Sequence, residues 1–152
     1  MVQAKTYRAG LDIGSTTAKI ALLDQNDQLI FFDYQRHHAR VYQTALDFFR
    51  QITAQEKECV LDLKLTGSAA LGISEKTEFA FVQEVIATHQ FVKNRYPDVK
   101  TAIDIGGEDS KMIFFESGKP PDIRMNGSCA GGTGSFIDQM ATLLDISPFQ
   151  LN

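Results

Sequence analysis

Asp104-Ile105-Gly106-Gly107-Glu108-Asp109-Ser110-Lys111 repeats the pattern of an earlier stretch, Asp12-Ile13-Gly14-Ser15-Thr16-Thr17-Ala18-Lys19. In each copy an apolar segment, 8–13 or 100–105, runs into an acidic residue and then into a turn of small residues. The chain leaves each turn through a second apolar segment. This pattern predicts a β-hairpin with a carboxylate near its tip. Two copies indicate one device used twice, although two unrelated hairpins with the same turn chemistry would look similar.

The two loops carry groups that suit a polyphosphate and its metal ion. Glycines let backbone N–H groups approach an anion closely, and an aspartate can hold a hydrated divalent cation. We therefore expect Asp12 and Asp104 to hold Mg²⁺ through water and to act in catalysis, with Glu108 beside the metal or orienting the attacking water. The residues expected to contact phosphate are Gly14, Ser15, Thr16, Thr17, Lys19, Gly106, Gly107 and Asp109.

The composition is that of an ordinary globular protein, with 43% hydrophobic and 22% charged residues among 152. A net charge of −4 argues against nucleic acid or an anionic membrane surface as a partner. No segment approaches the roughly 18 apolar residues of a membrane span, and residues 1–10 lack a secretory signal. We therefore expect a cytoplasmic protein. Two cysteines are too few for a disulfide scaffold, and Cys59 is expected to be a small core residue.

Hydrophobic patterning predicts an α/β domain in residues 1–98, with the element order βββαβα. The first helix should cover the sheet with the apolar face that carries Val41, Ala45, Phe48, Phe49 and Ile52. A loop of small residues is expected at 67–72. The expected strands are 7–13, 18–23, 28–34 and 59–65, and the expected helices are 41–55 and 81–96.

The same order begins again in residues 99–152. Strands are expected at 100–105, 111–115 and 121–125, followed by a helix that ends before Pro148. The apolar side of that helix carries Phe136, Ile137, Met140, Leu143 and Leu144. The pattern βββα then stops without the strand and helix that complete the first copy. We therefore interpret this region as the beginning of a second, incomplete domain.

Four polar residues on these elements have ordinary structural interpretations beside functional ones. His37 and His38 are adjacent, so in an extended chain they point to opposite sides, and a solvated connection is favoured over a metal pair. His89 falls on the apolar stripe of the second helix, where a satisfied core histidine is more common than a ligand. Glu84 lies beside that stripe and is either a solvated residue or a catalytic one.

A glycine-rich stretch from Asn126 to Ser135 contains Cys129 just before the last helix. It lacks the lysine of a Walker A loop and the spacing of a GxGxxG fingerprint. Unpaired N–H groups and the helix dipole favour a thiolate there, which suits a reactive or metal-ligating sulfur, although a cysteine tolerated in a tight loop is also possible. An iron-sulfur cluster needs four ligands. Cys129 would therefore need another cysteine and a second copy of the chain.

The stretches 10–19, 104–111 and 125–134 closely resemble the ATPase activators of 2-hydroxyacyl-CoA dehydratases and the related ATPase subunits of benzoyl-CoA reductases. That family belongs to the superfamily of acetate kinase, sugar kinases, heat-shock chaperone ATPases and actin. The resemblance implies ribonuclease-H-like, actin-like ATPase domains with MgATP in the cleft between them. It also implies a homodimer that shares one 4Fe-4S cluster, with Cys129 as a cluster ligand and Glu84 at a glutamate position of the family.

The implied function is the ATP-driven transfer of a low-potential electron to a 2-hydroxyacyl-CoA dehydratase or a related reductase component. Two features depart from the pattern of the small activators. They commonly have Gln at the position of Glu108, and basic residues at the positions of Ser128 and Ser135. The adenosine-binding segment and the second cluster cysteine of the family lie downstream of residue 152. We therefore expect an amino-terminal fragment of a larger activator, with ATPase activity only in the longer protein.

Two other functions fit parts of the sequence. A small-molecule kinase of the same superfamily would use a carboxylate to deprotonate a substrate hydroxyl, but it has no need of Cys129. A non-catalytic interaction module could keep the fold for docking a partner.

Overall fold

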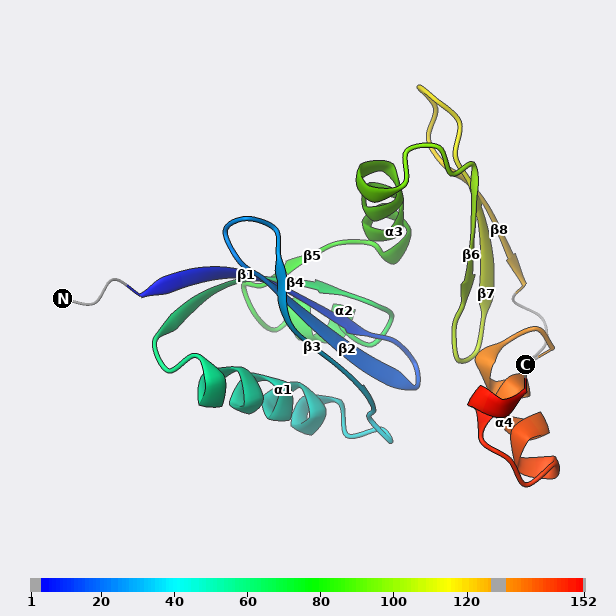
Figure 1. Cartoon of the computed structure of the whole chain (residues 1–152), viewed down its shortest axis with the longest axis horizontal. Helices are drawn as coiled ribbons and strands as arrows, with labels where there is room; N and C mark the ends of the chain where they lie inside the picture. Colours follow the sequence, from blue (N-terminus) through cyan, green and yellow to red (C-terminus); the bar gives the residue numbers. More distant parts are fainter. Residues whose placement is uncertain (1–3, 127–130, 152) are drawn as a thin grey trace. The chain divides into compact units, whose positions relative to one another are not determined.

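The structure, a computed structural model of the chain, describes residues 4–126 and 131–151. Cys129 and Ser128 lie outside these residues. The chain divides into two compact units, Met1–Glu84 and Val85–Asn152, which are described separately here (Figure 1). The predicted domain boundary at residue 98 rests on the sequence repeat and stays a prediction. In the described part of the chain, no helix is long and apolar enough to cross a membrane.

The described residues of the first unit contain a mixed five-stranded sheet with the order β3-β2-β1-β4-β5. The central strand β1 pairs antiparallel with β2 and parallel with β4, and this confirms the predicted α/β class. Along β1 and β2 buried and exposed residues alternate, as expected for strands with one covered face. The strands are β1 (Lys5–Ile13), β2 (Thr17–Leu23), β3 (Leu29–Arg36), β4 (Cys59–Thr66) and β5 (Ala80–Phe81).

Helix α1 (Val41–Gln55) lies along one face of this sheet (Figure 1). Its residues Ala45, Phe48 and Ile52 are buried against strand residues, and Val41 and Phe49 pack at the edge of the same core. The predicted helix face is therefore confirmed. The strand residues that complete this core are Tyr7, Ala9, Leu11, Ile13, Ala18, Ile20, Leu22 and Leu65.

Residues 67–83 differ from the prediction. A short helix α2 (Leu71–Ser74) and the two-residue strand β5 stand where a loop and the start of a long helix were expected. Strand β5 pairs parallel with β4 through Lys64 to Ala80 and Leu65 to Phe81. The predicted order βββαβα therefore lacks one short helix and one strand. Two residues are too few to show an alternating pattern, so only the pairing with β4 reveals this strand.

The carboxylate of Asp33 joins β3 to α1. Its two oxygens accept hydrogen bonds from the backbone N–H of Tyr34 at 2.7 Å, from Gln35 Nε2 at 2.7 Å and from Gln51 Nε2 at 3.1 Å. Partial burial raises the pKa of Asp33, but the three hydrogen bonds together outweigh it and hold the pKa below the ordinary value of 3.8.

The lowered pKa of Asp33 predicts that the first unit loses stability in acid. A lowered folded-state pKa contributes stability that is present above the unfolded-state pKa and is lost as the pH falls through the folded-state pKa. We expect Asp33→Asn to cost about 1 kcal/mol at pH 7 and less as the pH falls below about 4. Urea unfolding at several pH values measures this. Asp62→Asn, at an exposed position of β4, is the matched control. An equal cost at pH 7 and pH 2.5 would contradict the prediction.

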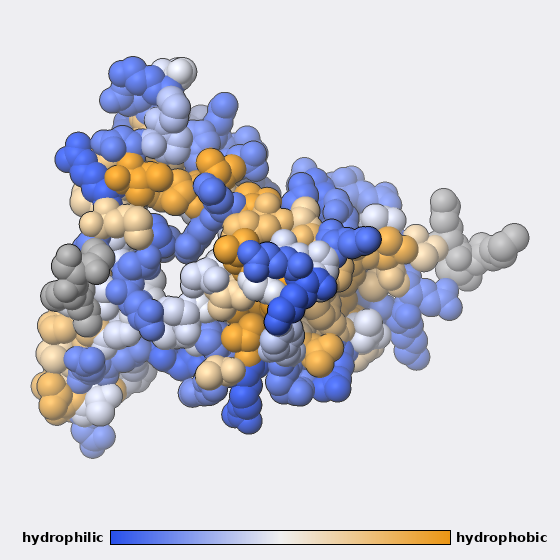
Figure 2. Space-filling model, turned by 180° about the vertical axis from the view of Figure 1, so that it is seen from behind, coloured by the Kyte–Doolittle hydropathy of each residue, from blue (hydrophilic) through white to orange (hydrophobic). Residues whose placement is uncertain are grey.

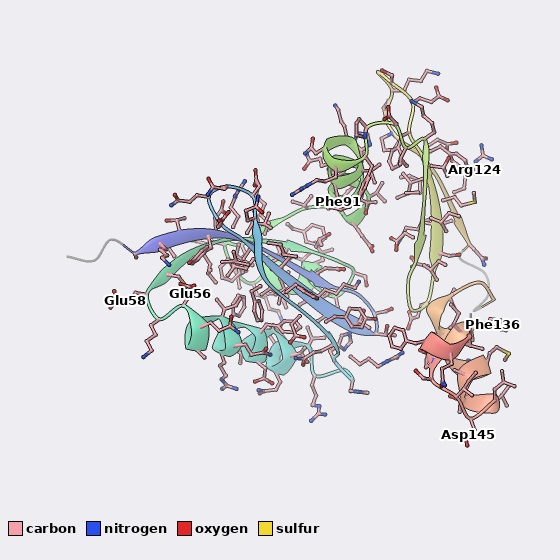
Figure 3. The ribbon with its side chains drawn as sticks, in the orientation of Figure 1. Glu56, Glu58, Phe91, Arg124, Phe136 and Asp145 are labelled. Atoms are coloured by element: carbon pink, nitrogen blue, oxygen red, sulfur yellow. The ribbon has the colours of Figure 1, made fainter. Side chains whose placement is uncertain are left out.

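The end of α1 is also tied to the start of the sheet. Lys5 Nζ lies 3.7 Å from the carboxylate of Glu56. Glu56 is the residue that follows the helix (Figure 3). The negative charge of Glu56 is the largest cause of the raised pKa of Lys5. Both side chains are accessible to solvent, so this ion pair adds little to the stability of the first unit.

The second unit contains an antiparallel three-stranded sheet with the order β6-β7-β8 among its described residues. The strands are β6 (Thr101–Ile105), β7 (Ser110–Phe114) and β8 (Asp122–Asn126). Helix α3 (Glu84–Arg95) precedes them, and α4 (Gly134–Leu143) with a short 3-10 helix, η1 (Pro148–Gln150), follows. The predicted strands and the predicted final helix of this region are therefore confirmed.

The apolar side of α4 is mostly uncovered within the described residues. Leu143 is 77% exposed and Leu144 62% exposed, and only Ala141 of this helix is buried. Hydrophobic surface is accordingly visible over α4 at the lower left of Figure 2. The periodicity predicted the helix correctly. Periodicity identifies a face that needs cover, but it does not say which element supplies the cover.

Candidate functional site: two glycine loops at strand ends

The first loop connects β1 to β2. Asp12 and Lys19 lie directly opposite each other in the two strands, and Lys19 Nζ lies 2.8 Å from Asp12 Oδ2. The turn is closed by a hydrogen bond of 2.9 Å from the N–H of Gly14 to the carbonyl oxygen of Thr17. The spacing of seven residues between the aspartate and the lysine therefore has a structural cause. It places the two side chains on one face of a hairpin.

The second loop has the same construction. Asp104 lies opposite Lys111, and the N–H of Gly106 donates to the carbonyl oxygen of Asp109 at 2.8 Å. Lys111 Nζ is 3.8 Å from Asp104 Oδ2 and 3.2 Å from Asp109 Oδ2. Lys111 is buried, so its charge is balanced by both carboxylates. The prediction of two hairpins with a common design is confirmed, and the design extends to the closing hydrogen bond.

Each loop presents backbone donors. In the part of the chain that the structure describes, the N–H groups of Ser15 and Thr16 have no hydrogen-bond acceptor. The same holds for Gly107 and Glu108 in the second loop. Two successive free amides beside a lysine are groups that suit a phosphoryl oxygen. The arrangement can therefore bind an anion at each loop.

The carboxylate of Asp12 has one oxygen still to satisfy. Oδ2 is held by Lys19, whereas Oδ1 is buried without a hydrogen-bond partner among the described atoms. The hydroxyl oxygen of Thr66, the residue paired with Asp12 across β1 and β4, is also buried without a partner. Buried polar atoms normally have partners, so this pair fits a site for a water molecule or a hydrated cation.

The chemistry of these donors fits Mg²⁺ better than a metal held by protein ligands alone. The described residues contain no group of three His, Cys, Asp or Glu side chains that could hold a metal ion. Mg²⁺ is usually held by one or two carboxylates, with waters and substrate phosphates completing the shell. The predicted binding of Mg²⁺ by Asp12 and Asp104 through water stays a prediction.

The described cysteine does not fit an iron-sulfur cluster. Cys59 is a free thiol at the start of β4 and packs against the hydrophobic core of the first unit. Its expected role as a small core residue is confirmed. The proposed cluster ligand, Cys129, lies outside the described residues, so its role stays a prediction.

The N-terminus of α4 contacts the second loop, and this contact was not predicted. The N–H of Gly134 donates to the carbonyl oxygen of Gly106 at 2.8 Å, and the N–H of Ser135 donates to that of Gly107 at 3.1 Å. The hydroxyl of Ser135 donates to the same Gly107 oxygen. Ser135 stands where the resemblance led us to expect a basic residue, so here a hydroxyl group holds the loop.

His37 contacts the first loop, and the prediction of a solvated histidine there is wrong. The side chain is buried, with Nε2 3.0 Å from the carbonyl oxygen of Gly14. His38 is exposed, as expected. Adjacent residues at the end of β3 do point in different directions, but the sequence does not reveal that one direction leads to the loop between β1 and β2.

The remaining predicted residues lie at separate places. Glu108 is exposed at the tip of the second loop, and Glu84 is the first residue of α3. The catalytic roles of these two residues stay predictions, as does the joint grip of both loops on one polyphosphate. His89 is half-buried and 5.5 Å from the ring of Phe115, but its Nδ1 has no partner among the described atoms. It is not the satisfied core histidine that was expected.

Comparison with known proteins places this geometry in context. The model of the BadF/BadG/BcrA/BcrD ATPase family matches residues 9–151. The (R)-2-hydroxyglutaryl-CoA dehydratase activating ATPase of Acidaminococcus fermentans is 29% identical over 145 residues, which are 92% of this chain and 54% of the relative. The chain therefore spans about half the length of the curated relatives it matches.

Among the solved structures that are similar to this chain, two come from dehydratase systems. The crystal structure of component A of the Acidaminococcus fermentans dehydratase superposes with a TM-score of 0.79 at 25% identity, over 94% of this chain and 56% of that one. The activator of 2-hydroxyisocaproyl-CoA dehydratase from Clostridium difficile, with bound ADPNP, superposes with a TM-score of 0.77 at 23% identity. That match covers 93% of this chain and 53% of the other. The mixed α/β fold is thus that of actin-like ATPase activators.

Proposed function

The chain belongs to the BadF/BadG/BcrA/BcrD ATPase family, and from this premise we propose that it carries the phosphate-binding loops of an ATPase that activates a 2-hydroxyacyl-CoA dehydratase. One observation carries the proposal. Two hairpins of common design each combine an aspartate–lysine pair, a closing hydrogen bond from a glycine amide, and two free amides at the tip. The proteins it resembles are named as activating ATPases of such dehydratases.

The chemistry follows from the groups at each loop. The amides of Ser15 and Thr16 would hold one phosphoryl group, and those of Gly107 and Glu108 another. Mg²⁺, when bound, would neutralise charge between the phosphates. Asp12 and Asp104 would hold its waters. The exposed carboxylate of Glu108 would orient the attacking water, and Glu84 would act as a second carboxylate near the phosphates.

The wider organisation is also part of the proposal. Residues 1–98 would form the first ribonuclease-H-like lobe, and residues 99–152 the beginning of a second lobe. The longer activators would bind MgATP between two such lobes. The βββα order of the second region and the shared loop design support this interpretation.

The electron-transfer part of the proposal rests on the family likeness and on Cys129. This residue would supply one thiolate per copy to a 4Fe-4S cluster in a homodimer, and the cluster would supply the low-potential electron for a dehydratase or related reductase component. The described residues provide no further cysteine ligand. A reducing, cytoplasmic location suits both the cluster and the free thiol of Cys59.

Binding of inorganic triphosphate tests the phosphate-binding role directly. In ¹⁵N-labelled chain, we expect addition of Mg²⁺ and triphosphate to shift the amide signals of Ser15, Thr16, Gly107 and Glu108. Asp12→Asn should weaken binding about tenfold in the presence of Mg²⁺ and much less in its absence, because the lost carboxylate would hold the metal rather than the anion. Asp62→Asn, which removes an exposed carboxylate from β4 of the same sheet, should change neither affinity.

Two outcomes would contradict this proposal. One is the absence of any shift at millimolar triphosphate. The other is a set of shifts confined to the lysine-rich surface formed by Lys93, Lys100 and Lys119 in the second unit, since those residues line a separate pocket. If Asp12→Asn weakens triphosphate binding equally with and without Mg²⁺, Asp12 does not hold the metal, although the anion site itself would stand.

A further inference from the structure

His37 makes two contacts with the first phosphate loop, one from its ring and one from its backbone. The ring nitrogen Nε2 lies 3.0 Å from the carbonyl oxygen of Gly14. The backbone N–H of His37 donates to the carbonyl oxygen of Thr16 at 3.2 Å. The residue is only 5% exposed, so both contacts are shielded from water. A buried polar side chain is therefore directed at the turn between β1 and β2.

The second ring nitrogen determines which tautomer makes this contact. The N–H of Ala39 donates to His37 Nδ1 at 3.1 Å, so Nδ1 acts as an acceptor and carries no hydrogen. The neutral ring then carries its hydrogen on Nε2, which donates to the Gly14 oxygen. Each ring nitrogen thus has one partner, and the two bonds specify one orientation of the imidazole.

The contact with Gly14 controls the direction of a loop amide. In a trans peptide the C=O and the following N–H point in opposite directions. Holding the Gly14 oxygen toward His37 therefore turns the N–H of Ser15 away from His37. The backbone bond to the Thr16 oxygen restrains the Thr16–Thr17 peptide, two peptides further along the loop, in the same way. Ser15 is one of the two residues of the first loop whose amides have no acceptor in the described part of the chain.

The second loop supports this interpretation independently. Gly106 occupies the position of Gly14, two residues after the aspartate, and its carbonyl oxygen is also held from outside the hairpin. Here the donor is the N–H of Gly134 at the start of α4, at 2.8 Å. In both loops the carbonyl at the equivalent position is therefore restrained, but by unrelated donors. A structural requirement at this position explains the coincidence better than chance packing.

The backbone that presents His37 is itself unusual. His38 has φ of 48° and Ala39 has φ of 61°, so two successive non-glycine residues occupy the left-handed region. Such residues persist where the surrounding structure holds them, and they gather near functional sites. The tight turn after His37 brings the N–H of Ala39 onto Nδ1, which links the strained turn to the orientation of the ring.

We propose that His37 is a positioning residue of the first phosphate loop, which turns the Ser15 amide toward a phosphoryl oxygen by holding the Gly14 carbonyl. This rests on the proposed function, because it concerns the same anion site. His37 itself does not touch the ligand. Its effect passes through the Gly14–Ser15 peptide, so it should act on affinity rather than on the chemical step.

Two amide substitutions separate the ring's two hydrogen bonds. In His37→Gln the longer side chain can place its amide N–H near the position of Nε2 and donate to Gly14. In His37→Asn the shorter side chain can accept from Ala39 as Nδ1 does, but it does not reach Gly14. His38→Asn is the matched control, since it removes the neighbouring imidazole and Asn tolerates the left-handed conformation.

We expect His37→Asn to weaken triphosphate binding about tenfold, the effect of losing one oriented hydrogen bond, and His37→Gln to restore it to within about threefold of the wild type. His38→Asn should bind as the wild type does. Residual dipolar couplings of the Ser15 N–H report the orientation of the peptide without any ligand. They should change in His37→Asn and stay unchanged in His37→Gln and His38→Asn. Thermal unfolding identifies a variant that fails to fold.

The two measurements separate the two proposals. If the wild type binds no triphosphate, the proposed function fails, and the dipolar couplings alone decide the role of His37. Equal losses of affinity in folded His37→Asn and His37→Gln, or an unchanged Ser15 orientation in His37→Asn, would overturn the positioning role. A long-range ¹H–¹⁵N spectrum that places the ring hydrogen of His37 on Nδ1 and none on Nε2 would also overturn it.

Discussion

Gly67→Ala should destabilise the first unit by about 4 kcal/mol and disturb the Asp12 carboxylate. Gly67 has φ of 92°, a backbone conformation that residues other than glycine rarely adopt. A Cβ there would lie 2.5 Å from the carbonyl carbon of Ile13 and would overlap both the Ile13 oxygen and Asp12 Oδ1. Two of these atoms are backbone of the central strand, so the clash cannot be relieved by a side-chain rotation. Urea unfolding monitored in the first unit measures the loss.

Two other glycines provide matched controls for this substitution. A Cβ at Gly10 or at Gly72 meets no atom within 4 Å. Gly72→Ala lies in α2 and should be neutral or stabilising by up to about 1 kcal/mol, and Gly10→Ala should be close to neutral. A Gly67→Ala variant as stable as these controls would show that the turn after β4 does not pass against Asp12 as described.

This substitution also bears on the site. Because the clash involves Asp12 Oδ1, a folded Gly67→Ala variant should lose the Mg²⁺-dependent part of triphosphate binding. Sequence alone indicated a loop of small residues at this place. It did not indicate that the glycine is needed to leave space for the carboxylate of a residue more than fifty positions earlier.

Phe48→Ala should destabilise the first unit by about 3 to 5 kcal/mol, the usual cost of deleting a fully buried aromatic ring. Phe48 has 0% exposure and lies at the centre of the α1 face that covers the sheet. Removal of the ring leaves a cavity between the helix and the strands, where neighbouring residues are held by strand pairing and can collapse only partly. Denaturant unfolding measures the loss, and hydrogen exchange of the β1 and β2 amides locates it.

Leu46→Ala on the same helix is the matched control. Leu46 is 50% exposed, and its truncation should change stability by less than about 0.5 kcal/mol. Similar losses for Phe48→Ala and Leu46→Ala would mean that α1 does not bury the face described here. A loss of protection in β6 and β7 as large as that in β1 and β2 would contradict the division into two units.

The features that sequence predicted correctly depend on neighbouring residues. The alternation in β1 and β2, the apolar face of α1 and the aspartate–lysine spacing each involve residues within about two turns or one hairpin of each other. Asp12 and Lys19 are an example, because they lie opposite each other in the paired strands and their side chains are in contact. Such local patterns are visible in a single sequence, since the period of the pattern is the period of the element.

The features that sequence missed depend on residues far apart along the chain. His37 reaches Gly14 from the end of β3, Ser135 reaches Gly107 from the start of α4, and β5 exists because it pairs with β4. Nothing in the local composition of these segments distinguishes them from solvated turns. Two signals in the sequence point toward these contacts: a histidine directly after a strand that flanks a phosphate loop, and a serine in place of an expected basic residue.

The sequence by itself therefore determined the two hairpin loops, their carboxylate–lysine pairs and the helix that covers the first sheet, because each follows from spacing within a short segment. Only the tertiary structure decided how the loop amides are oriented. That orientation depends on which distant donor meets the carbonyl of Gly14 or of Gly106, His37 in one loop and Gly134 in the other. A peptide plane can turn about its neighbouring dihedral angles at little cost, so a partner outside the hairpin has to hold it.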